Sequence, residues 1–363
     1  MLSIIINQIK PSFLTSSEFN TDEDAIEIIY WLKLRLNTPN TYKTYRVVIF
    51  RFYLWMKFKN YTLKSITRKE IIDYLEFIQN PPLDWCGSRH HFIHPEWRPF
   101  HKKLSKTGIK FNIQIIRQLF NDLVDADYLA KSPVLKQLKY TSEIKNLPQE
   151  RYLTSKEYKQ LYHYIESLPE NNRSNIYRKH RIKWIVTLLI YTGCRTAELT
   201  NAKMSDIIFK NERCWLRVIG KGNKYGEIPV VSTLESALND YRSFYHLYKV
   251  RCNIELESDI PLIIKSKKGH IYKKCTNATI YREIKIFCTQ FAATISNKTF
   301  ADKLLRVSTH WFRHTSATLQ VDAGIDIRVV QRNLRHSSIE TTMLYQHVQQ
   351  DNQHDEINSK FNI

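Results

Sequence analysis

Near its C-terminal end the chain carries a set of side chains suited to chemistry on a phosphodiester. Two arginines, two histidines and a late tyrosine make up the set: Arg195, His310, Arg313, His336 and Tyr345. The planar guanidinium group of arginine binds two phosphate oxygens at once. Histidine can transfer protons near neutral pH, and tyrosine can act as a covalent nucleophile. The set therefore predicts a site that binds and cuts a phosphodiester bond.

Two lysines in a glycine-containing turn are candidates for the group that protonates the leaving oxygen. Cleavage of DNA without a metal requires an in-line nucleophile, positive donors at the phosphoryl oxygens and an acid for the leaving 5′ oxygen. Lys221 lies between two strand candidates, 215–219 and 225–231. This arrangement predicts a β-hairpin with a basic tip. Lys224 is the rival for the same role.

The spacing of these residues resembles that of the tyrosine recombinase (phage integrase) family, and of its Xer-like members in particular. Residues 192–199 read Thr-Gly-Cys-Arg-Thr-Ala-Glu-Leu, similar to the family pattern Thr-Gly-Leu-Arg followed by Glu-Leu. The number of residues between His336 and Tyr345 matches the family's spacing, as does the number between Arg313 and His336. The resemblance covers residues 153–348 and implies a site-specific recombinase or integrase, with DNA recombination and DNA integration by a mobile element as the expected setting.

The resemblance implies a role for each residue of the site. The six catalytic residues are Arg195 and Arg313 as phosphate clamps, Lys221 as the acid, His310 as a proton-positioning group, His336 as a donor to a non-bridging oxygen, and Tyr345 as the nucleophile. Glu198 lies one helical turn beyond Arg195 and is expected to orient it. Attack by Tyr345 would leave a 3′-phosphotyrosyl bond and a free 5′ hydroxyl. Two such rounds in a tetramer would pass through a Holliday junction, without cofactor or metal.

Two positions depart from the family pattern. Cys194 replaces an apolar residue, which cysteine imitates well. Arg335 replaces the usual glycine before His336, so a positive φ there would cost about 1 kcal/mol. The added charge of Arg335 can alternatively contact a DNA phosphate. His314, next to Arg313, is expected to point away from the site.

The segment before the site predicts a small all-helical domain that binds the core DNA sequence. Its boundaries are 22–140, and its predicted helices cover 22–36, 41–58, 67–79 and 106–126. Prolines in the insertion 81–104 argue against regular structure there. Basic and aromatic residues alternate along the second helix, which favours a folded basic surface. The DNA-binding candidates of the whole chain are Lys43, Arg46, Arg51, Lys224 and Arg335.

The second domain is expected to be mostly α-helical with a small β-sheet or hairpin, an α+β class. A polar linker, 141–152, precedes the catalytic domain 153–348. Predicted helices cover 181–191, 277–293, 309–324, 327–333 and 338–347, and another begins near 232. Residues 1–21 form an N-terminal extension, and the tail 349–363 resembles the segment that exchanges between protomers in the family. The two domains together are expected to close around DNA as a C-shaped clamp.

Composition supports a nucleic-acid partner. The formal net charge is +20, with 55 Lys and Arg against 35 Asp and Glu among 363 residues. Such a field attracts polyanions. We expect double-stranded DNA carrying a recombination site, a free monomer that becomes a tetramer on DNA, no membrane association, and a cytoplasmic, nucleoid-associated protein. Five residues of the insertion can bind zinc, Cys86, His90, His91, His94 and His101, but their spacing matches no zinc pattern. No metal is therefore expected.

Two other classes of function share parts of this pattern. A basic helical regulator can keep the fold and bind DNA without cutting it, although the complete set of six residues argues against this alternative. A type IB topoisomerase or a telomere resolvase uses the same chemistry. Formation of a covalent DNA adduct separates the enzymes from the binding-only protein.

Overall fold

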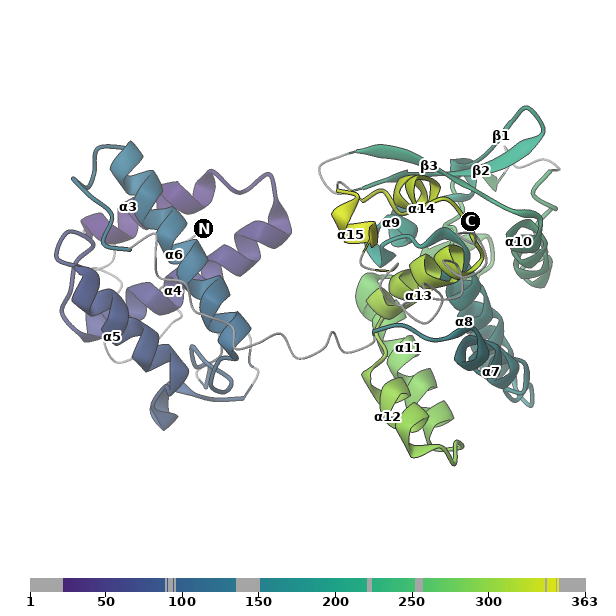
Figure 1. The fold of residues 1–363 in the computed structure, drawn as a ribbon, viewed down its shortest axis with the longest axis horizontal. Coiled ribbons are helices and arrows are strands. Elements are labelled where there is room, and N and C mark those ends of the chain that lie inside the picture. Colours follow the sequence, from purple (N-terminus) through teal and green to yellow (C-terminus); the bar gives the residue numbers. More distant parts are fainter. Residues whose placement is uncertain are drawn as a thin grey trace, which may run out of the picture. The chain divides into compact units, whose positions relative to one another are not determined.

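The computed structural model describes residues 22–134 and 151–345, except residues 89, 91–93, 95, 221–223, 252–256, 337 and 344 (Figure 1). The chain divides into two compact units, Met1–Leu147 and Pro148–Ile363. Each unit is described by itself. The predicted extension 1–21, most of the linker 141–152, and the tail 349–363 lie outside the described residues.

The first unit is built from helices, as its sequence predicts. They are α3 (Glu23–Lys33), α4 (Pro39–Phe58), α5 (Arg68–Gln79) and α6 (Lys106–Asp125). Helix α5 begins with the predicted capping box, in which Thr67 and Glu70 satisfy each other's backbone N–H groups. The described part of the insertion contains the short 3₁₀ turn η1 (Leu83–Trp85), and a β-bridge pairs Cys86 with Phe100.

Aromatic side chains fill the core of the first unit. Phe52 and Trp55 of α4 contact Tyr74 of α5, and Phe52 also meets Phe120 of α6 edge-on. At the edge of this core the Asp122 carboxylate accepts a hydrogen bond from the Trp31 indole at 2.7 Å, which ties α3 to α6. These contacts make the unit a packed helical domain rather than a basic arm.

The second unit holds most of the helices. They are α7 (Ser155–Glu166), α8 (Arg173–Thr192), α9 (Thr196–Asn201), α10 (Ser232–Phe244), α11 (Asn277–Ala292), α12 (Lys298–Arg306), α13 (Thr309–Asp322), α14 (Ile327–Leu334) and α15 (Glu340–Met343), with a 3₁₀ turn, η2 (Met204–Asp206). Helix α8 begins eight residues before the predicted start at 181. The prediction started too late because the first half of the helix is polar and lacks an amphipathic pattern. Helices α9 and α12 were not predicted.

Two small antiparallel sheets complete the second unit. The first has the order β1 (Ile207–Lys210), β2 (Arg213–Ile219) and β3 (Tyr225–Pro229), and β2 and β3 form the predicted hairpin. The second pairs β4 (Ile264–Lys268) with β5 (Ile271–Lys274). The second sheet was missed because its short, lysine-rich strands lack an alternating apolar pattern. The expected class, mostly α with a small β-sheet, is confirmed.

Among the described residues, none of the helices combines the length and the apolar character needed to span a bilayer.

Candidate active site

The site is assembled where helix ends of the second unit meet. Helix α8 ends at Gly193, whose φ of 57° is left-handed. A Cβ at Gly193 would lie 2.4 Å from Cδ2 of Leu334, the last residue of α14. Glycine therefore allows the ends of α8 and α14 to approach closely. Arg195 follows directly, as the N-terminal cap of α9.

Arg313 is the buried centre of this arrangement, at 2% exposure on α13. Its guanidinium group donates to the carbonyl oxygen of Gly193 at 2.7 Å and to that of Leu334. The side chain thus joins the ends of α8 and α14. Burial, followed by the charge of Arg195, lowers the pKa of Arg313 to about 10. Arg313 therefore stays charged at neutral pH, fixed through backbone contacts.

Arg195 is the accessible arginine of the pair. Its side chain is 44% exposed, and its Nη1 donates to Oε1 of Glu198 at 3.2 Å. The Arg195 backbone N–H also donates to Oε2 of Glu198 at 2.8 Å. Glu198 is 5% exposed. Glu198 therefore lies where it can orient Arg195, in the geometry expected from the sequence.

Arg335 adopts the left-handed backbone, with φ 53° and ψ 48°. Its Nη2 pairs with Oε2 of Glu198, and its side chain is 16% exposed. Arg335, a DNA-binding candidate, therefore pairs within the protein with Glu198, the carboxylate that also contacts Arg195.

Tyr345 is buried beside two histidines. Its exposure is 8%, and it packs against Ala317, Val330 and Leu334. Its hydroxyl lies 2.5 Å from Nδ1 of His314. The expectation that His314 points away from the site is therefore wrong. His314 follows His310 by four residues, a spacing that places both on one helical face and was the available signal.

His336 also lies beside the tyrosine ring. The two rings are nearly parallel, 6.3 Å apart between centroids. Nδ1 of His336 lies 2.8 Å from the hydroxyl of Thr342 in α15. This contact fixes the imidazole and leaves Nε2 as the ring nitrogen for another partner.

Electrostatics show that these groups share one site. Burial, then the charges of Arg313 and Arg195, lowers the pKa of His310 and takes that of His336 to about 4. Burial raises the pKa of Tyr345, and the charge of Arg313 opposes the rise. The site is thus a positively charged group of side chains in which the histidines are neutral at pH 7 and the tyrosine is a phenol.

This electrostatic state predicts that the protein loses stability in mild acid. The pKa values of His314 and His336 are both about 4, against an ordinary value of 6.5. For His314 the causes are burial and then the charges of His310, Arg151 and Arg313. Between pH 6.5 and 4 the unfolded chain therefore binds more protons than the folded chain, so the free energy of unfolding falls as the pH is lowered through this window. Denaturant titrations from pH 7.5 to 4 measure this slope.

The matched comparison uses His314→Gln combined with His336→Gln. Glutamine does not titrate, so the doubly substituted protein should lose less stability than the wild type over the same pH range. Equal slopes in the two proteins would contradict the assignment of the acid sensitivity to these imidazoles.

Of the six predicted catalytic residues, the structure brings five together, and the sixth, Lys221, lies outside the described residues. The hairpin neck next to Lys221 is described, and Gly220 N–H donates to the Lys224 carbonyl oxygen at 2.8 Å. A Cβ on Gly220 would lie 3.2 Å from Oε1 of Glu198. Gly220, where the turn between β2 and β3 begins, therefore lies beside Glu198. The packing around His310 on α13 partly desolvates its ring, but the residue as a whole stays exposed, unlike Arg313 three residues later.

The other DNA-binding candidates differ in exposure. Lys43 and Lys224 are exposed, and Arg46 is half-buried near the ring of Tyr42. Arg51 instead donates to the carbonyl oxygen of Pro99 at 2.6 Å and lies over the ring of Phe100. Arg51 therefore fastens α4 to the insertion, in contrast to its expected position on a DNA-facing surface.

Three residues of the insertion bring metal-binding atoms within 4.8 Å of one another: His90, His94 and Glu96. His90 pairs with Glu96 at 3.2 Å, and the rings of His90 and His94 stack at 4.1 Å, 11° from parallel. Lone pairs in parallel ring planes run side by side and do not converge on one ion. The contact between Nε2 of His90 and Oε2 of Glu96, together with the ring stacking, accounts for the arrangement.

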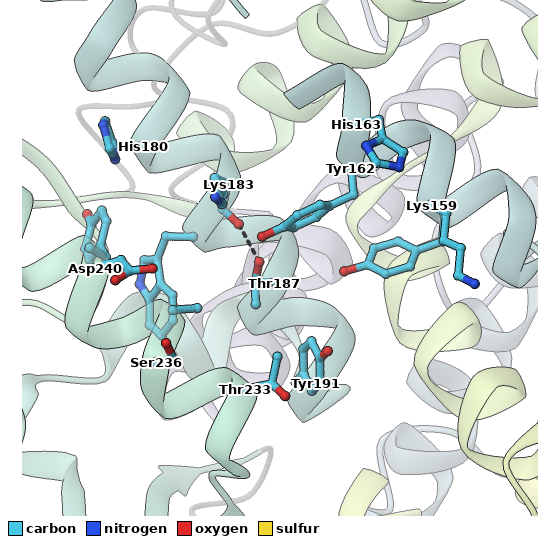
Figure 2. Close-up of a pocket in the computed structure, with 14 residues that line it drawn as sticks. Lys159, Tyr162, His163, His180, Lys183, Thr187, Tyr191, Thr233, Ser236 and Asp240 are labelled. Carbon is cyan, nitrogen blue, oxygen red and sulfur yellow. Dashed lines mark hydrogen bonds between the residues drawn. The ribbon is translucent and has the colours of Figure 1, made fainter. Parts of the chain in front are cut away.

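The second unit also contains a cavity of about 560 Å³ among α7, α8 and α10. Figure 2 shows Tyr162, Lys183 and Thr187 on its wall, with Asp240 and Ser236 on the opposite side. None of the five catalytic candidates that the structure describes lines this cavity.

Comparison with known proteins identifies the class. Residues 151–352, more than half of the chain, match the phage integrase family. The chain is 29% identical over 252 residues to tyrosine recombinase XerC of Pediococcus pentosaceus, covering 69% of this chain and 74% of that protein. It is 31% identical over 205 residues to tyrosine recombinase XerA of Pyrococcus furiosus, covering 56% and 59%.

Solved structures agree on the fold. The structure of XerH bound to a palindromic difH substrate, a post-cleavage complex, matches with a TM-score of 0.61 at 18% identity and covers 99% of this chain and 94% of that one. A lambda integrase dimer bound to a COC′ core site matches with a TM-score of 0.57 at 17% identity, covering 88% and 75%.

The chain belongs to the phage integrase family. It is a tyrosine site-specific recombinase, an enzyme of DNA strand cleavage and transfer. The family, the fold class and the enzyme class expected from the sequence are confirmed.

Proposed function

We propose that the second unit cuts and rejoins DNA at a specific site through a 3′-phosphotyrosyl bond at Tyr345. In this proposal Arg195 and Arg313 bind the scissile phosphate, and His336 donates to a non-bridging oxygen. The roles are those that the family resemblance implies for these positions. Rejoining to a second strand proceeds through a Holliday junction, and the retained bond energy makes an external energy source unnecessary.

One observation carries the proposal: the balance of charges among the side chains of the site. Three guanidinium groups, those of Arg195, Arg313 and Arg335, gather around a single carboxylate, Glu198. Within the described residues, this leaves two positive charges uncancelled. A phosphodiester brings one negative charge, and attack by a phenolate adds a second as the phosphorus becomes five-coordinate. These charges therefore stabilise the five-coordinate phosphate more than the ground-state phosphodiester.

Nucleophile activation has a candidate in His314. Its Nδ1 is 2.5 Å from the Tyr345 hydroxyl, and its lowered pKa keeps the ring neutral. A neutral imidazole can accept the phenol proton as the oxygen attacks phosphorus. We assign His314 this role, with His310 beside it as the next group in line, at 4.5 Å between ring centroids.

Trapping the covalent adduct on DNA of random sequence tests the proposed function. Random-sequence duplexes with a nick near the expected cleavage position lose a short strand after cleavage, so the covalent complex accumulates. Complexes that survive denaturing detergent are recovered and sequenced over several rounds. Enrichment of one sequence by the wild type, and not by Tyr345→Phe, supports site-specific cleavage. Tight duplex binding without any adduct would favour a DNA-binding regulator.

A modified substrate tests Lys221 as the acid. Lys221→Ala should slow cleavage about 10²- to 10⁴-fold, the usual contribution of a positioned acid. With sulfur in place of the leaving 5′ oxygen the leaving group departs as a thiolate and needs no proton, so the variant should recover a near wild-type rate. The measurement is the single-turnover rate of adduct formation on both substrates.

Lys224→Ala is the matched control, because it removes a lysine from the same turn. If Lys224→Ala slows cleavage and the sulfur-containing substrate restores its rate, while Lys221→Ala shows no such defect, the acid is Lys224. A defect in Lys221→Ala that sulfur does not rescue contradicts the acid role.

For the assembly, we propose a free monomer that forms a tetramer on two DNA sites. The second unit has an apolar cavity of about 720 Å³ lined by residues such as Ile190, Trp215, Leu319, Ile325 and Val329. The tail 349–363 of a neighbouring protomer, which contains Ile357 and Phe361, is the proposed occupant. Light scattering with and without DNA tests the stoichiometry, and removal of residues 349–363 should abolish the tetramer while single-site binding remains.

The remaining assignments follow from DNA as the partner. The structural relatives named above are bound to DNA sites in their crystals. We propose that the first unit, within 22–140, binds the core DNA sequence, that 141–152 links it to the catalytic domain 153–348, and that the protein works in association with the nucleoid in the cytoplasm. Footprints of the two units produced separately would test this division.

A further inference from the structure

A buried carboxylate next to the proposed reaction centre has every oxygen occupied. Oε1 of Glu198 accepts from Nη1 of Arg195 at 3.2 Å. Oε2 accepts from the Arg195 backbone N–H at 2.8 Å and pairs with Nη2 of Arg335. Arg335 is thus the second cation on a carboxylate that is 5% exposed. Breaking one side of such a set leaves a buried charge poorly compensated.

The backbone and its neighbours make room for Arg335. Its φ of 53° lies in the left-handed region, which disfavours residues with a Cβ. The side chain then passes Gly226 of β3, where a Cβ would lie 2.5 Å from Cδ of Arg335. Its Nη1 ends 4.0 Å from Sγ of Cys194. Arg335 thus adopts an unfavourable backbone conformation and needs the space left by Gly226, which indicates that its side chain has a function at this position.

The charges suggest what that purpose is. Glu198 lies beside Arg195, so its negative charge opposes the binding of a phosphate and also competes for the Arg195 guanidinium group. A second guanidinium on Glu198 offsets this charge. Arg195 then keeps its alignment while its positive charge remains available to the substrate.

We propose that Arg335 is a positioning residue for the cleavage step: it neutralises and holds Glu198, which keeps Arg195 aligned on the scissile phosphate, and the lack of a side chain at Gly226 is what lets Arg335 reach Glu198. The inference rests on the proposed role of Arg195 in phosphate binding. It differs from the simpler expectation that Arg335 contacts a DNA phosphate itself.

Single-turnover adduct formation on the enriched site, at saturating protein, tests the proposal. Arg335→Gly relieves the backbone conformation but removes the cation, so the rate constant should fall about tenfold or more, as misalignment of a binding group does. Arg335→Lys restores the charge and should recover part of the rate. Arg328→Ala, which removes an exposed arginine from the same helix, α14, should leave the rate unchanged and controls for net charge.

DNA affinity and its salt dependence separate the two roles of Arg335. A residue that acts through Glu198 leaves the slope of log affinity against log salt unchanged when it is replaced. A phosphate contact of its own would reduce the slope by about one. An unchanged slope with a slowed cleavage step supports the proposal. A slope reduced by about one, with loss of affinity and a normal rate at saturation, overturns it.

Gly226→Ala supplies an independent variant. The added Cβ should displace the Arg335 side chain from Glu198 and slow cleavage as Arg335→Gly does. Because both changes break the same contact, the double variant should be no slower than Arg335→Gly alone. Effects that multiply in the double variant would show that Gly226 acts elsewhere and would overturn that part of the proposal.

Failure of this inference is distinguishable from failure of the proposed function. If the wild type forms no adduct, the proposed function itself fails. If the wild type reacts and Arg335→Gly reacts at the same rate with an unchanged thermal midpoint, only the role of Arg335 is overturned. Melting curves of each variant exclude unfolding as the cause of a slowed reaction.

Discussion

Replacing Tyr345 with phenylalanine should abolish covalent adduct formation, to below about a thousandth of the wild-type rate, because phenylalanine has no oxygen with which to attack phosphorus. The ring is 8% exposed and packs with Ala317, Val330 and Leu334, and phenylalanine preserves this packing. The variant should therefore keep its fold and its affinity for the DNA site. Denaturing gels of protein incubated with labelled nicked duplex measure the adduct.

Loss of the hydroxyl also removes the contact with His314 at 2.5 Å. Another tyrosine of the second unit serves as the control: Tyr191 is partly exposed on α8, and Tyr191→Phe should react as the wild type does. Residual adduct in Tyr345→Phe at more than a few per cent of the wild-type level would assign the nucleophile to another residue.

Replacing Arg313 should damage both cleavage and stability. The guanidinium group is 2% exposed and holds the carbonyl oxygens of Gly193 and Leu334. Hydrogen bonds to a charged donor contribute about 1.5–3 kcal/mol each, so Arg313→Ala should lower the free energy of unfolding by a few kcal/mol. Loss of a phosphate clamp should also slow cleavage about 10²- to 10³-fold.

The two effects of Arg313 are separated by Arg313→Lys. Lysine retains the charge but donates from one point and cannot bridge two carbonyls and a phosphate together. It should recover part of the stability and less of the rate. Denaturant unfolding and single-turnover cleavage of the same samples measure both. A normal cleavage rate in either variant would remove Arg313 from the site.

Much of the fold and part of the site can be read from the sequence because local signals mark them. The capping box at Thr67 and Glu70 in the first unit, the hairpin of β2 and β3, and the spacing of Arg313 from His310 all depend on neighbours in the chain. These features predicted the main elements, and all six candidates fall within the second unit.

The remaining features depend on contacts between distant segments, which spacing does not reveal. His310 and Arg313 share a helix, yet Arg313 is buried and His310 is exposed, because the ends of α8 and α14 cover one side only. The pairing of Arg335 with Glu198 spans 137 positions of the chain. Arg51 was expected to face DNA and instead binds Pro99, a contact set by the path of the insertion.

The central claim is that Tyr345 becomes covalently joined to the 3′ phosphate of the cut strand. Digestion of the trapped adduct with a protease and a nuclease, followed by mass spectrometry of the nucleotide-bearing peptide, tests it most directly. The account predicts a single modified peptide carrying a 3′-phosphate-linked nucleotide on Tyr345, with a free 5′ hydroxyl on the released strand. A nucleotide on any other side chain, or a 5′-phosphate linkage, would contradict it.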